Sequence, residues 1–308
     1  MKGVFIGIDW GTTHRRAALL SATGELLAEV ADAEGALACA GRHRESLEAL
    51  IARWPEAQPG ATVVMAGMIG AAIGWQAVPY VEAPAALAGL GARRVRVGEA
   101  PADRQWFIVP GVCVRTSDGE VDVMRGEETQ LLGASQWLGP AAADGDYVLP
   151  GTHSKWVRLE GGRVQELRTY LTGELFALLR QHGTLASVMS GGAGPVDPDD
   201  PAFLHGLQDA AHRPTLSHAL FGARARVVTG VLEPAAAAAY VSGLLIGAEW
   251  ADVHDTVGAT DRPVRMIGEP ALAALHAVAA RVHRRRLQVL DARAIQLAAW
   301  RALQKELA

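Results

Sequence analysis

The sequence predicts an α/β protein with two similar domains, each a mixed β-sheet flanked by helices. Three observations lead to this expectation. The first predicted elements follow the order strand, strand, strand, helix, strand, which is typical of a mixed sheet with helices on its faces. A strand, a glycine turn and a second strand open the chain, and the same pattern recurs near its middle. The 308 residues, 50% hydrophobic and 20% charged, are enough chain for about two cores of ordinary size.

Residues 1–140 are expected to form the N-terminal domain. Short apolar runs between turns predict its strands, and apolar residues at helical spacing predict its helices. Pro55 ends the first helix and Pro140 follows the second, because proline cannot continue a helix. The predicted strands cover 3–9, 16–21, 25–31, 62–66, 106–109 and 112–116, and the predicted helices cover 43–54 and 127–138.

Residues 141–308 are expected to form the C-terminal domain. The predicted strands cover 147–149, 156–160, 163–167, 264–267 and 287–290, and the predicted helices cover 172–181, 234–250, 271–284 and 292–307. Residues 191–200, rich in Gly, Pro and Asp, predict a loop. The alanine-rich helix that begins at Pro234 has the composition of a tightly packed, buried helix. The basic residues between 281 and 286 follow a helix, where the helix dipole favours cations, so we interpret them as a solvated cap rather than an anion site.

Charge and composition favour a small-molecule partner. With 29 Lys plus Arg against 33 Asp plus Glu, the net charge of −4 gives no global positive field for nucleic acid or an anionic membrane. The uncharged stretch 57–81 contains two prolines and four glycines, so it predicts a buried strand and a glycine-rich loop rather than a membrane span. No secretory signal is expected at the N-terminus, and two distant cysteines, Cys39 and Cys113, argue against a disulfide framework. These features predict a cytoplasmic protein.

The turn after the first strand is a candidate phosphate site. It contains Gly11, Thr12 and Thr13, preceded by Asp9 and followed by Arg16. Such a turn can present backbone N–H groups and two hydroxyls to phosphate oxygens, while the carboxylate holds Mg²⁺ directly or through water. An ordinary hairpin with a polar tip is the alternative.

A second candidate phosphate turn follows the strand at 147–149. It contains Gly151, Thr152, His153 and Lys155. Either turn alone could be structural, but two of them, separated by about half the chain, would hold the phosphates of a nucleotide from opposite sides of a cleft. The pair is therefore a more specific signal than either turn.

Two acids lie between these turns, at the start of the helix predicted at 127–138. Phosphoryl transfer to an alcohol needs a carboxylate beside the attacking hydroxyl, and Glu127 and Glu128 are the candidates. The alternative is that both acids only occupy a helical first turn, where negative charge is favourable.

Taken together, these residues resemble the motifs of the 2-dehydro-3-deoxygalactonokinase family, bacterial sugar-acid kinases in the superfamily of sugar kinases, heat-shock 70 proteins and actin. The resemblance covers nearly the whole chain, and MRGEETQLLGA and PGTHSKWV are its most specific parts. It implies two actin-like (ribonuclease H-like) domains with an interdomain cleft. Residues 187–200 and 281–286 resemble nothing in this family. The matching segments are 9–13 with Arg16, 65–70 with Trp75, 79–80, 124–133, 149–157, 172–175 and 242–249.

The resemblance also implies roles for particular residues. GEET at 126–129 is similar to the GDQQ motif of glycerol and xylulose kinases, which makes Glu127 the counterpart of their catalytic aspartate and leaves Glu128 in reserve. Residues 66–70 are similar to their sugar-binding loop. Gly268 and Glu269 resemble the adenosine-binding turn of the superfamily, or else form a plain strand-to-helix connection. The substrate-binding residues implied are Gly67, Met68, Gly70, Trp75 and Arg125.

The function implied is ATP-dependent phosphorylation of 2-dehydro-3-deoxy-D-galactonate at its terminal 6-hydroxyl, in galactonate catabolism. Glu127 would accept the hydroxyl proton, Asp9 would order Mg²⁺, and Arg125 would bind the substrate carboxylate or else pair with Glu128. No metal site made of protein ligands alone is expected, because Mg²⁺ arrives with ATP.

Two other functions remain open. One is a kinase of the same fold that acts on another sugar or sugar acid, such as 2-dehydro-3-deoxygluconate. The other is a non-catalytic sugar-sensing regulator, although such regulators usually carry an added DNA-binding helix-turn-helix and the first strand here is expected at about Gly3. The sequence predicts no particular oligomeric state.

Overall fold

The structure is a computed structural model that describes residues 3–57, 60–189, 191, 194–212, 215–257 and 262–307. The chain divides into two compact units, and the boundary passes through strands β12 (Ser154–Glu160) and β13 (Arg163–Tyr170). Unit 1 consists of Met1–Asp144, Val157–Leu167 and Asp291–Ala308, and unit 2 consists of Gly145–Trp156 and Arg168–Leu290.

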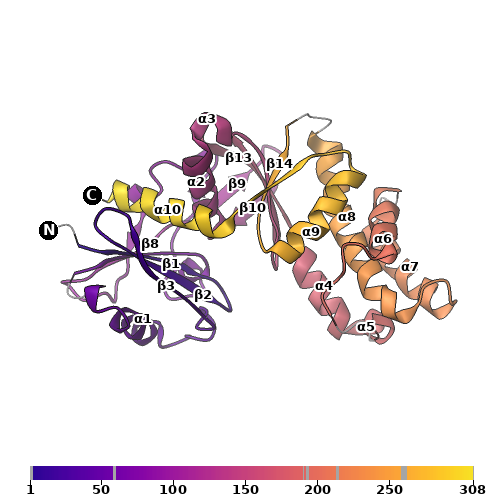
Figure 1. The fold of residues 1–308 in the computed structure, drawn as a ribbon, viewed down its shortest axis with the longest axis horizontal. Coiled ribbons are helices and arrows are strands. Elements are labelled where there is room, and N and C mark those ends of the chain that lie inside the picture. Colours follow the sequence, from indigo (N-terminus) through magenta and orange to yellow (C-terminus); the bar gives the residue numbers. More distant parts are fainter. Residues whose placement is uncertain are drawn as a thin grey trace. The chain divides into compact units, whose positions relative to one another are not determined.

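Unit 1 is built on a six-stranded mixed sheet with the order β3-β2-β1-β4-β8-β7 (Figure 1). The first three strands form consecutive antiparallel hairpins, as the sequence predicts, and β4 and β8 then pair in parallel. The strands are β1 (Phe5–Trp10), β2 (Arg15–Leu20), β3 (Leu26–Asp32), β4 (Thr62–Ala66), β7 (Val95–Arg96) and β8 (Gln105–Ile108).

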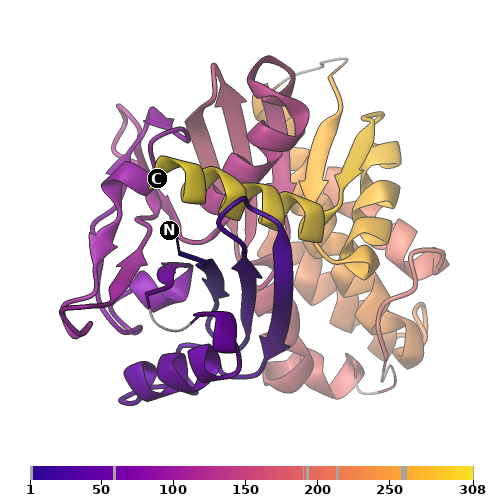
Figure 2. The same cartoon turned by 60° about the vertical axis from the view of Figure 1, so that its left-hand side comes forward.

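Side chains of β1 alternate between two helical layers. Ile6 and Ile8 belong to the core that also contains the buried face of α1 (His43–Ala52). Gly7 points the other way, and a Cβ on it would lie 2.2 Å from Cδ2 of Trp300 on α10 (Ala292–Glu306). The C-terminal helix therefore crosses the strands of the first half of the chain (Figure 2).

Helix α10 also packs against α2 (Glu127–Leu138). A Cβ on Gly133 of α2 would lie only 2.0 Å from the carbonyl oxygen of Ile295, so the two helix backbones are in direct contact. The sequence placed residues 292–307 in the second domain, whereas this packing groups them with unit 1. The position of α10 in the sequence did not indicate this grouping, because the helix packs against segments from the first half of the chain.

The rest of unit 1 contains small sheets and short helices. β9 pairs with β10 in a hairpin that leads into α2, and β6 pairs with β13. The sequence patterns did not predict β5, β6, β7 or β10. These elements are β5 (Val81–Glu82), β6 (Ala85–Ala86), β9 (Val112–Arg115), β10 (Val121–Met124), α3 (Pro140–Ala143) and the 3₁₀ turns η1 (Pro55–Ala57), η2 (Met68–Gly70) and η3 (Gly91–Arg93).

Unit 2 combines parallel strands with a helical core. The strands β15, β14, β11 and β12 are neighbours in that order, and β14 pairs in parallel with both β11 and β15. The sequence analysis did not predict α5, α6 or α7. The elements are β11 (Gly145–Leu149), β14 (Val264–Ile267), β15 (Leu287–Leu290), α4 (Thr172–Gln181), α5 (Gly183–Met189), α6 (Pro201–His212), α7 (Leu216–Val228), η4 (Pro234–Ala236), α8 (Ala237–Val257) and α9 (Pro270–Val282).

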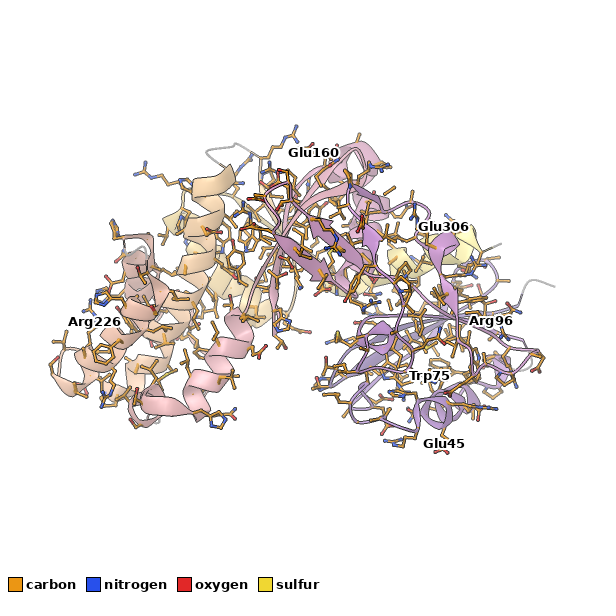
Figure 3. All side chains as sticks on the ribbon, turned by 180° about the vertical axis from the view of Figure 1, so that it is seen from behind. Glu45, Trp75, Arg96, Glu160, Arg226 and Glu306 are labelled. Atoms are coloured by element: carbon orange, nitrogen blue, oxygen red, sulfur yellow. The ribbon has the colours of Figure 1, made fainter. Side chains whose placement is uncertain are left out.

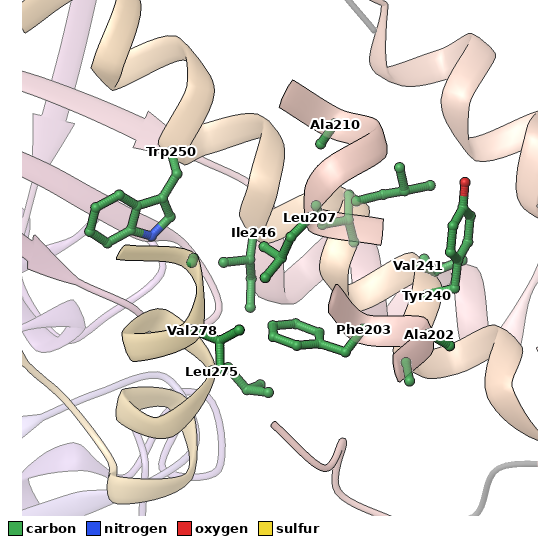
Figure 4. Packing of buried hydrophobic residues seen from close by; sticks show 14 of the residues in the cluster. Ala202, Phe203, Leu207, Ala210, Tyr240, Val241, Ile246, Trp250, Leu275 and Val278 are labelled. Carbon is green, nitrogen blue, oxygen red and sulfur yellow. The ribbon is translucent and has the colours of Figure 1, made fainter. Parts of the chain in front are cut away.

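Helix α8 is the centre of this core (Figure 4). Gly206 of α6 and Gly243 of α8 allow the two helices to touch, because a Cβ on Gly206 would lie 2.2 Å from the carbonyl oxygen of Tyr240. The predicted tight packing of the alanine-rich helix is confirmed. Although α8 is 21 residues long, neither it nor any other helix in the described parts of the chain is long and apolar enough to cross a membrane.

Candidate active site

The first group of candidate residues lies at the end of β1 in unit 1. Asp9 stands opposite Arg16 on β2 and Ala66 on β4, and Nη1 of Arg16 lies 3.7 Å from Oδ2 of Asp9. Burial raises the pKa of Asp9 to about 6; Arg16 opposes this shift, and the nearby charge of Glu127 reinforces it. The Asp9 side chain keeps 22% of its surface exposed, so a ligand can reach the carboxylate.

The turn after Asp9 uses part of its backbone to hold its own shape. The N–H of Gly11 donates to the carbonyl of His14 at 3.0 Å, and the carbonyls of Gly11 and Thr12 accept hydrogen bonds from Ala36 and Leu37. The hydroxyl of Thr13 lies 2.9 Å from Nδ1 of His14. The N–H of Gly11 is therefore already hydrogen-bonded within the turn. In the predicted phosphate site, Gly11 would act by letting the backbone come close to a phosphate group, not by donating this N–H.

Two glycines bring three segments of unit 1 together. Gly67 follows β4 with φ 92°, and a Cβ there would lie 2.9 Å from the carbonyl oxygen of Trp10 and 3.3 Å from Oδ1 of Asp9. Gly126 precedes α2 with φ 115°, and a Cβ there would lie 3.2 Å from Cα of Gly67. Only glycine adopts such backbone angles easily and permits these contacts. The end of β1, the loop after β4 and the start of α2 therefore meet.

The two acids at the start of α2 have different environments. Glu128 is fully buried, and its two carboxylate oxygens accept the Gly126 N–H at 2.8 and 3.0 Å. Burial raises its pKa to about 8, helped by the charge of Glu127. Glu127 is partly exposed, and its Oε2 accepts the Arg125 N–H at 3.0 Å. At pH 7 Glu128 mostly retains its proton, which leaves Glu127 as the better proton acceptor.

The Arg125 side chain is a buried cation beside the predicted sugar loop. Its Nη2 donates to the carbonyl of Val78 at 2.7 Å, and its guanidinium lies 4.2 Å from the ring centre of Tyr80. Its Nε and Nη1 have no hydrogen-bond partner, and a Cβ on Gly70 would lie 2.9 Å from Nη1. Because the Glu128 carboxylate is bonded to Gly126, the hydrogen bonds do not support the alternative pairing of Arg125 with Glu128.

Trp75 and Met68 occupy the packed side of the same loop. The indole of Trp75, which is labelled in Figure 3, donates to Glu99 at 3.0 Å. The Trp75 ring stacks on His43 with 6.1 Å between ring centres. The Trp75 N–H donates to the carbonyl of Ile69 at 2.9 Å. Met68 packs, partly buried, against the same core. These contacts give Trp75 a part in shaping the loop, and its contact with substrate stays a prediction.

The second candidate phosphate turn lies in unit 2, between β11 and β12. Gly151, Thr152 and His153 are exposed, and the start of α4 packs against them. The N–H of Glu174 donates to the carbonyl of Thr152 at 2.8 Å, and a Cβ on Gly173 would lie 2.2 Å from the carbonyl oxygen of Gly151. His153 Nε2 lies 2.7 Å from the Glu174 carboxylate.

Lys155 differs from the other residues of this turn because it is buried. Its ammonium donates to the Thr169 hydroxyl on β13 at 2.9 Å. A role for Lys155 in phosphate binding therefore stays a prediction, and the structure shows this cation bound to a neighbouring strand.

A mostly apolar pocket opens beside the second phosphate turn, within unit 2. The predicted adenosine turn is its neighbour, because a Cβ on Gly268 would lie 3.1 Å from Cγ of Pro150. Glu269 is exposed and precedes α9, whose first turns form one wall. The lining consists of Pro150, Gly151, Ser154, Thr172, Gly173, Phe176, Pro195, Val196, Ser242, Leu245, Ile246, Ala271, Leu272, Leu275 and His276. Apolar walls with a few polar groups suit a planar heteroaromatic ring such as adenine.

Sequence reasoning assigned no role to most of these lining residues. Thr172, Gly173, Ser242, Leu245 and Ile246 nevertheless fall inside the segments 172–175 and 242–249 that carry the family resemblance. The sequence signal that could have identified these lining residues is that they fall within segments that resemble the family motifs.

No group of three or more His, Cys, Asp or Glu residues in the described parts of the chain could hold a metal ion alone. Magnesium commonly binds through one or two carboxylates together with substrate phosphates and water. Asp9 is a carboxylate of this kind, partly exposed beside the first phosphate turn, so the residues present fit a Mg²⁺ ion that arrives with a nucleotide.

Comparison with known proteins places these features in one family. The family model for 2-keto-3-deoxy-galactonokinase matches residues 9–303. The chain is 38% identical to the 2-dehydro-3-deoxygalactonokinase of Escherichia coli (strain K12) over 83% of its length and 82% of the relative's. It is 36% identical to a probable 2-dehydro-3-deoxygalactonokinase of Rhizobium meliloti (strain 1021), over 94% of its length and 93% of the relative's.

Solved structures support the fold. A crystal structure assigned as a 2-dehydro-3-deoxygalactonokinase from Sinorhizobium meliloti matches with a TM-score of 0.89 at 33% identity, covering 98% of this chain and 99% of that chain. The activator of a 2-hydroxyisocaproyl-CoA dehydratase from Clostridium difficile matches with a TM-score of 0.50 at 13% identity, over 99% of this chain and 96% of that chain. The predicted α/β fold of the actin-like ATPases and sugar kinases is thereby confirmed.

Proposed function

Because the chain belongs to the 2-keto-3-deoxy-galactonokinase family, and is therefore a carbohydrate kinase, we propose that it transfers the γ-phosphoryl group of ATP to the terminal 6-hydroxyl of 2-dehydro-3-deoxygalactonate. The observation that supports this best is the meeting of Asp9, Gly67 and Gly126 in unit 1. This contact brings together a carboxylate suited to Mg²⁺, a glycine loop suited to a sugar, and the helix that begins with Glu127.

In this proposal Glu127 is the general base. It accepts the proton of the substrate hydroxyl as the bond to phosphorus forms. Glu128 instead fixes the start of α2, because its buried carboxyl binds the N–H of Gly126. The raised pKa of Glu128, about 8, keeps it protonated at neutral pH and unsuited to the same task.

Arg125 explains why the acceptor would be a sugar acid. A buried guanidinium with two nitrogen atoms lacking partners is costly, and a carboxylate is its best partner. Arg125 lies beside Gly70 of the loop that we assign to the sugar. A neutral hexose offers no negative charge to this cation.

Unit 2 supplies the nucleotide-binding residues in this proposal. Gly151 and Thr152 bind the phosphates, and the apolar pocket beside them takes the adenine ring, with Gly268 at its edge. For the turn after Asp9, the proposed phosphate-binding residues are Thr12, Thr13 and Arg16. Mg²⁺ would neutralise charge on the transferred phosphoryl group, and Asp9 would hold the ion, directly or through water.

We also propose that the enzyme works in the cytoplasm. Cys39 and Cys113 are both buried free thiols, which suits a reducing compartment. Cell fractionation with an antibody to the protein tests this, and recovery in a periplasmic or extracellular fraction would contradict it.

A coupled ADP-release assay tests the proposed reaction. The acceptor panel contains 2-dehydro-3-deoxygalactonate, 2-dehydro-3-deoxygluconate and neutral hexoses. Glu127→Gln should lower kcat by about 100-fold or more, because general acid–base catalysis typically contributes about 10²–10⁴-fold. Glu128→Gln should retain most activity, and Glu160→Gln, an exposed carboxylate labelled in Figure 3, serves as the control. Turnover of neutral sugars alone would reject the sugar-acid assignment, and full activity of Glu127→Gln would assign the base to another residue.

A further inference from the structure

Glu249 is a buried carboxylate on α8 that the proposed reaction does not use. Its side chain has no solvent exposure. The hydroxyl of Thr172, the first residue of α4, donates to its Oε2 at 2.8 Å. Burying a carboxylate is costly unless several donors surround it, so the remaining contacts of Glu249 indicate what it does.

Strand β12 presents two more donors to this carboxylate. Ser154 and Trp156, which alternate with Lys155 along the strand, both act to lower the pKa of Glu249, while burial, the larger effect, raises it to about 7. The Ser154 hydroxyl and the Trp156 indole are buried, and neither makes a hydrogen bond of full geometry with Glu249 or with any other group. Both residues directly follow the second phosphate turn in the chain.

A histidine of helix α9 lies on another side of the Glu249 carboxylate. Nε2 of His276 lies 3.5 Å from Oε1 of Glu249. The Trp250 indole donates to Nδ1 of His276 at 3.1 Å, and an indole can only donate, so Nδ1 has no proton and Nε2 carries it. Burial lowers the pKa of His276 to about 4, which keeps the ring neutral. The protonated Nε2 of His276 therefore lies near Oε1, although Oε1 accepts no hydrogen bond of full geometry.

The groups around Glu249 also shape the second phosphate turn. Thr172 begins α4, and the next residue, Gly173, is in contact with the carbonyl oxygen of Gly151. The N–H of Glu174 then donates to the carbonyl of Thr152. The start of α4 thus touches the turn directly, while Glu249 holds α4 through Thr172 and faces the strand that leaves the turn.

We propose that Glu249 is a positioning residue for the second candidate phosphate turn: it fixes the start of α4, which contacts Gly151 and Thr152, so that these two residues are held ready for the phosphates of a nucleoside di- or triphosphate. This inference rests on the proposed function, because it takes the turn as the phosphate site. Glu249 acts through other residues and does not itself touch the nucleotide.

Glutamine cannot replace this carboxylate. The hydroxyl of Thr172 donates to Oε2, and the protonated Nε2 of His276 lies 3.5 Å from Oε1, so the polar group nearest each oxygen is a donor. A glutamine amide has one acceptor and one donor group, and its NH₂ would face a donor in either orientation. Glu249→Gln keeps the shape of the side chain and should still disturb the turn.

The test compares ligands with and without phosphates on the full-length protein. Dissociation constants for Mg²⁺–ADP and for adenosine are measured by calorimetry for the parent, Glu249→Gln and Thr172→Val. We expect Glu249→Gln to bind Mg²⁺–ADP about tenfold more weakly or worse, which is about 1.4 kcal/mol, and adenosine within about threefold of the parent. Because Thr172 also lines the apolar pocket, we expect Thr172→Val to lose some adenosine affinity, but about threefold or more less than it loses for Mg²⁺–ADP. Asp252→Asn is the matched control, because Asp252 lies on the same helix but binds Arg168 and Tyr170.

The outcomes separate the possible failures. An equal loss of adenosine and ADP binding would mean that Glu249 supports only the general packing of the pocket, and would overturn the inference. Unchanged ADP binding in both variants would do the same. If Glu249→Gln does not fold, Thr172→Val still provides the comparison. A parent protein that binds neither ATP nor ADP would overturn the proposed function first, and this inference with it.

Discussion

Gly126→Ala tests the contact on which the proposed active site depends. Gly126 has φ 115° and ψ −45°, a conformation that L residues rarely adopt, so any side chain there costs about 1–3 kcal/mol in backbone strain. The new Cβ would also lie 3.2 Å from Cα of Gly67, and a backbone neighbour can yield only by shifting the loop or the helix. A shift of a few tenths of an ångström would move Glu127 relative to the acceptor. Since an error of about 1 Å can cost about 100-fold in rate, we expect kcat to fall about tenfold or more.

Gly119→Ala is the matched control for this variant. Gly119 has φ 94° on an exposed hairpin, and a Cβ there would have no atom within 4 Å. Gly119→Ala therefore introduces backbone strain like that of Gly126→Ala but no close contact with another segment. Thermal unfolding should show a Tm loss of a few degrees for both variants, and the coupled assay should show a large loss of kcat for Gly126→Ala alone. A Gly126→Ala enzyme that loses stability like the control but keeps the parent's kcat would refute the reasoning.

Four further outcomes are expected. Arg125→Gln should raise KM for the sugar acid about tenfold or more without changing KM for ATP, because only the acid has a carboxylate; an equal rise in both would contradict this. Burial raises the pKa of Asp9 to about 6, so the Mg²⁺ concentration for half-maximal activity should rise as the pH falls from about 7 to about 5.5, and a constant requirement would contradict a role in holding the ion. The folded-state pKa of Glu128, about 8, exceeds its unfolded value, so the free energy of unfolding should fall as the pH rises from 4.5 to about 8. In Glu128→Gln this fall should be less steep, and equal dependence of the unfolding free energy on pH in the two proteins, measured by chemical denaturation, would argue against a buried acid at this position. Gly133→Ala should lower Tm although alanine favours helices by about 1 kcal/mol, because its Cβ would lie 2.0 Å from the carbonyl oxygen of Ile295; a higher Tm would refute this helix contact.

Local patterns in the sequence predicted most of the regular structure of unit 1. The hairpins β1, β2 and β3 and the parallel strand β4 follow from alternating apolar runs and turn residues, which are signals within a few residues of each element. The same reasoning missed α6 and α7. Helix α6 does carry a start signal, because Asp200 accepts the N–H of Ala202 and Pro201 is the first helical residue, but the interpretation of residues 191–200 as a loop left this signal unused. Packing against α8 stabilises both helices.

The same difference between local sequence signals and tertiary packing applies to the candidate site. Sequence motifs named Asp9, Gly67, Glu127 and the turn at Gly151, because their chemistry resides in residue types at fixed spacing. Spacing alone left Glu127 and Glu128 as candidates, and the resemblance to the GDQQ motif put Glu127 first without giving a physical distinction between them. That distinction depends on burial, since one carboxyl is enclosed and bonded to Gly126 while its neighbour remains partly exposed.

The sequence by itself determined the fold class, the family and the order of the motifs, because these depend on local propensities and on residues that lie close together in the chain. Only the tertiary structure decided that α10 packs with the first half, that Arg125 is a buried cation lacking partners on two nitrogen atoms, and that Glu249 faces the strand after the second phosphate turn. The physical reason is that burial and pairing are properties of segments far apart in the sequence. Glu249 and Thr172 are separated by 77 residues, and nothing in either segment alone specifies their hydrogen bond.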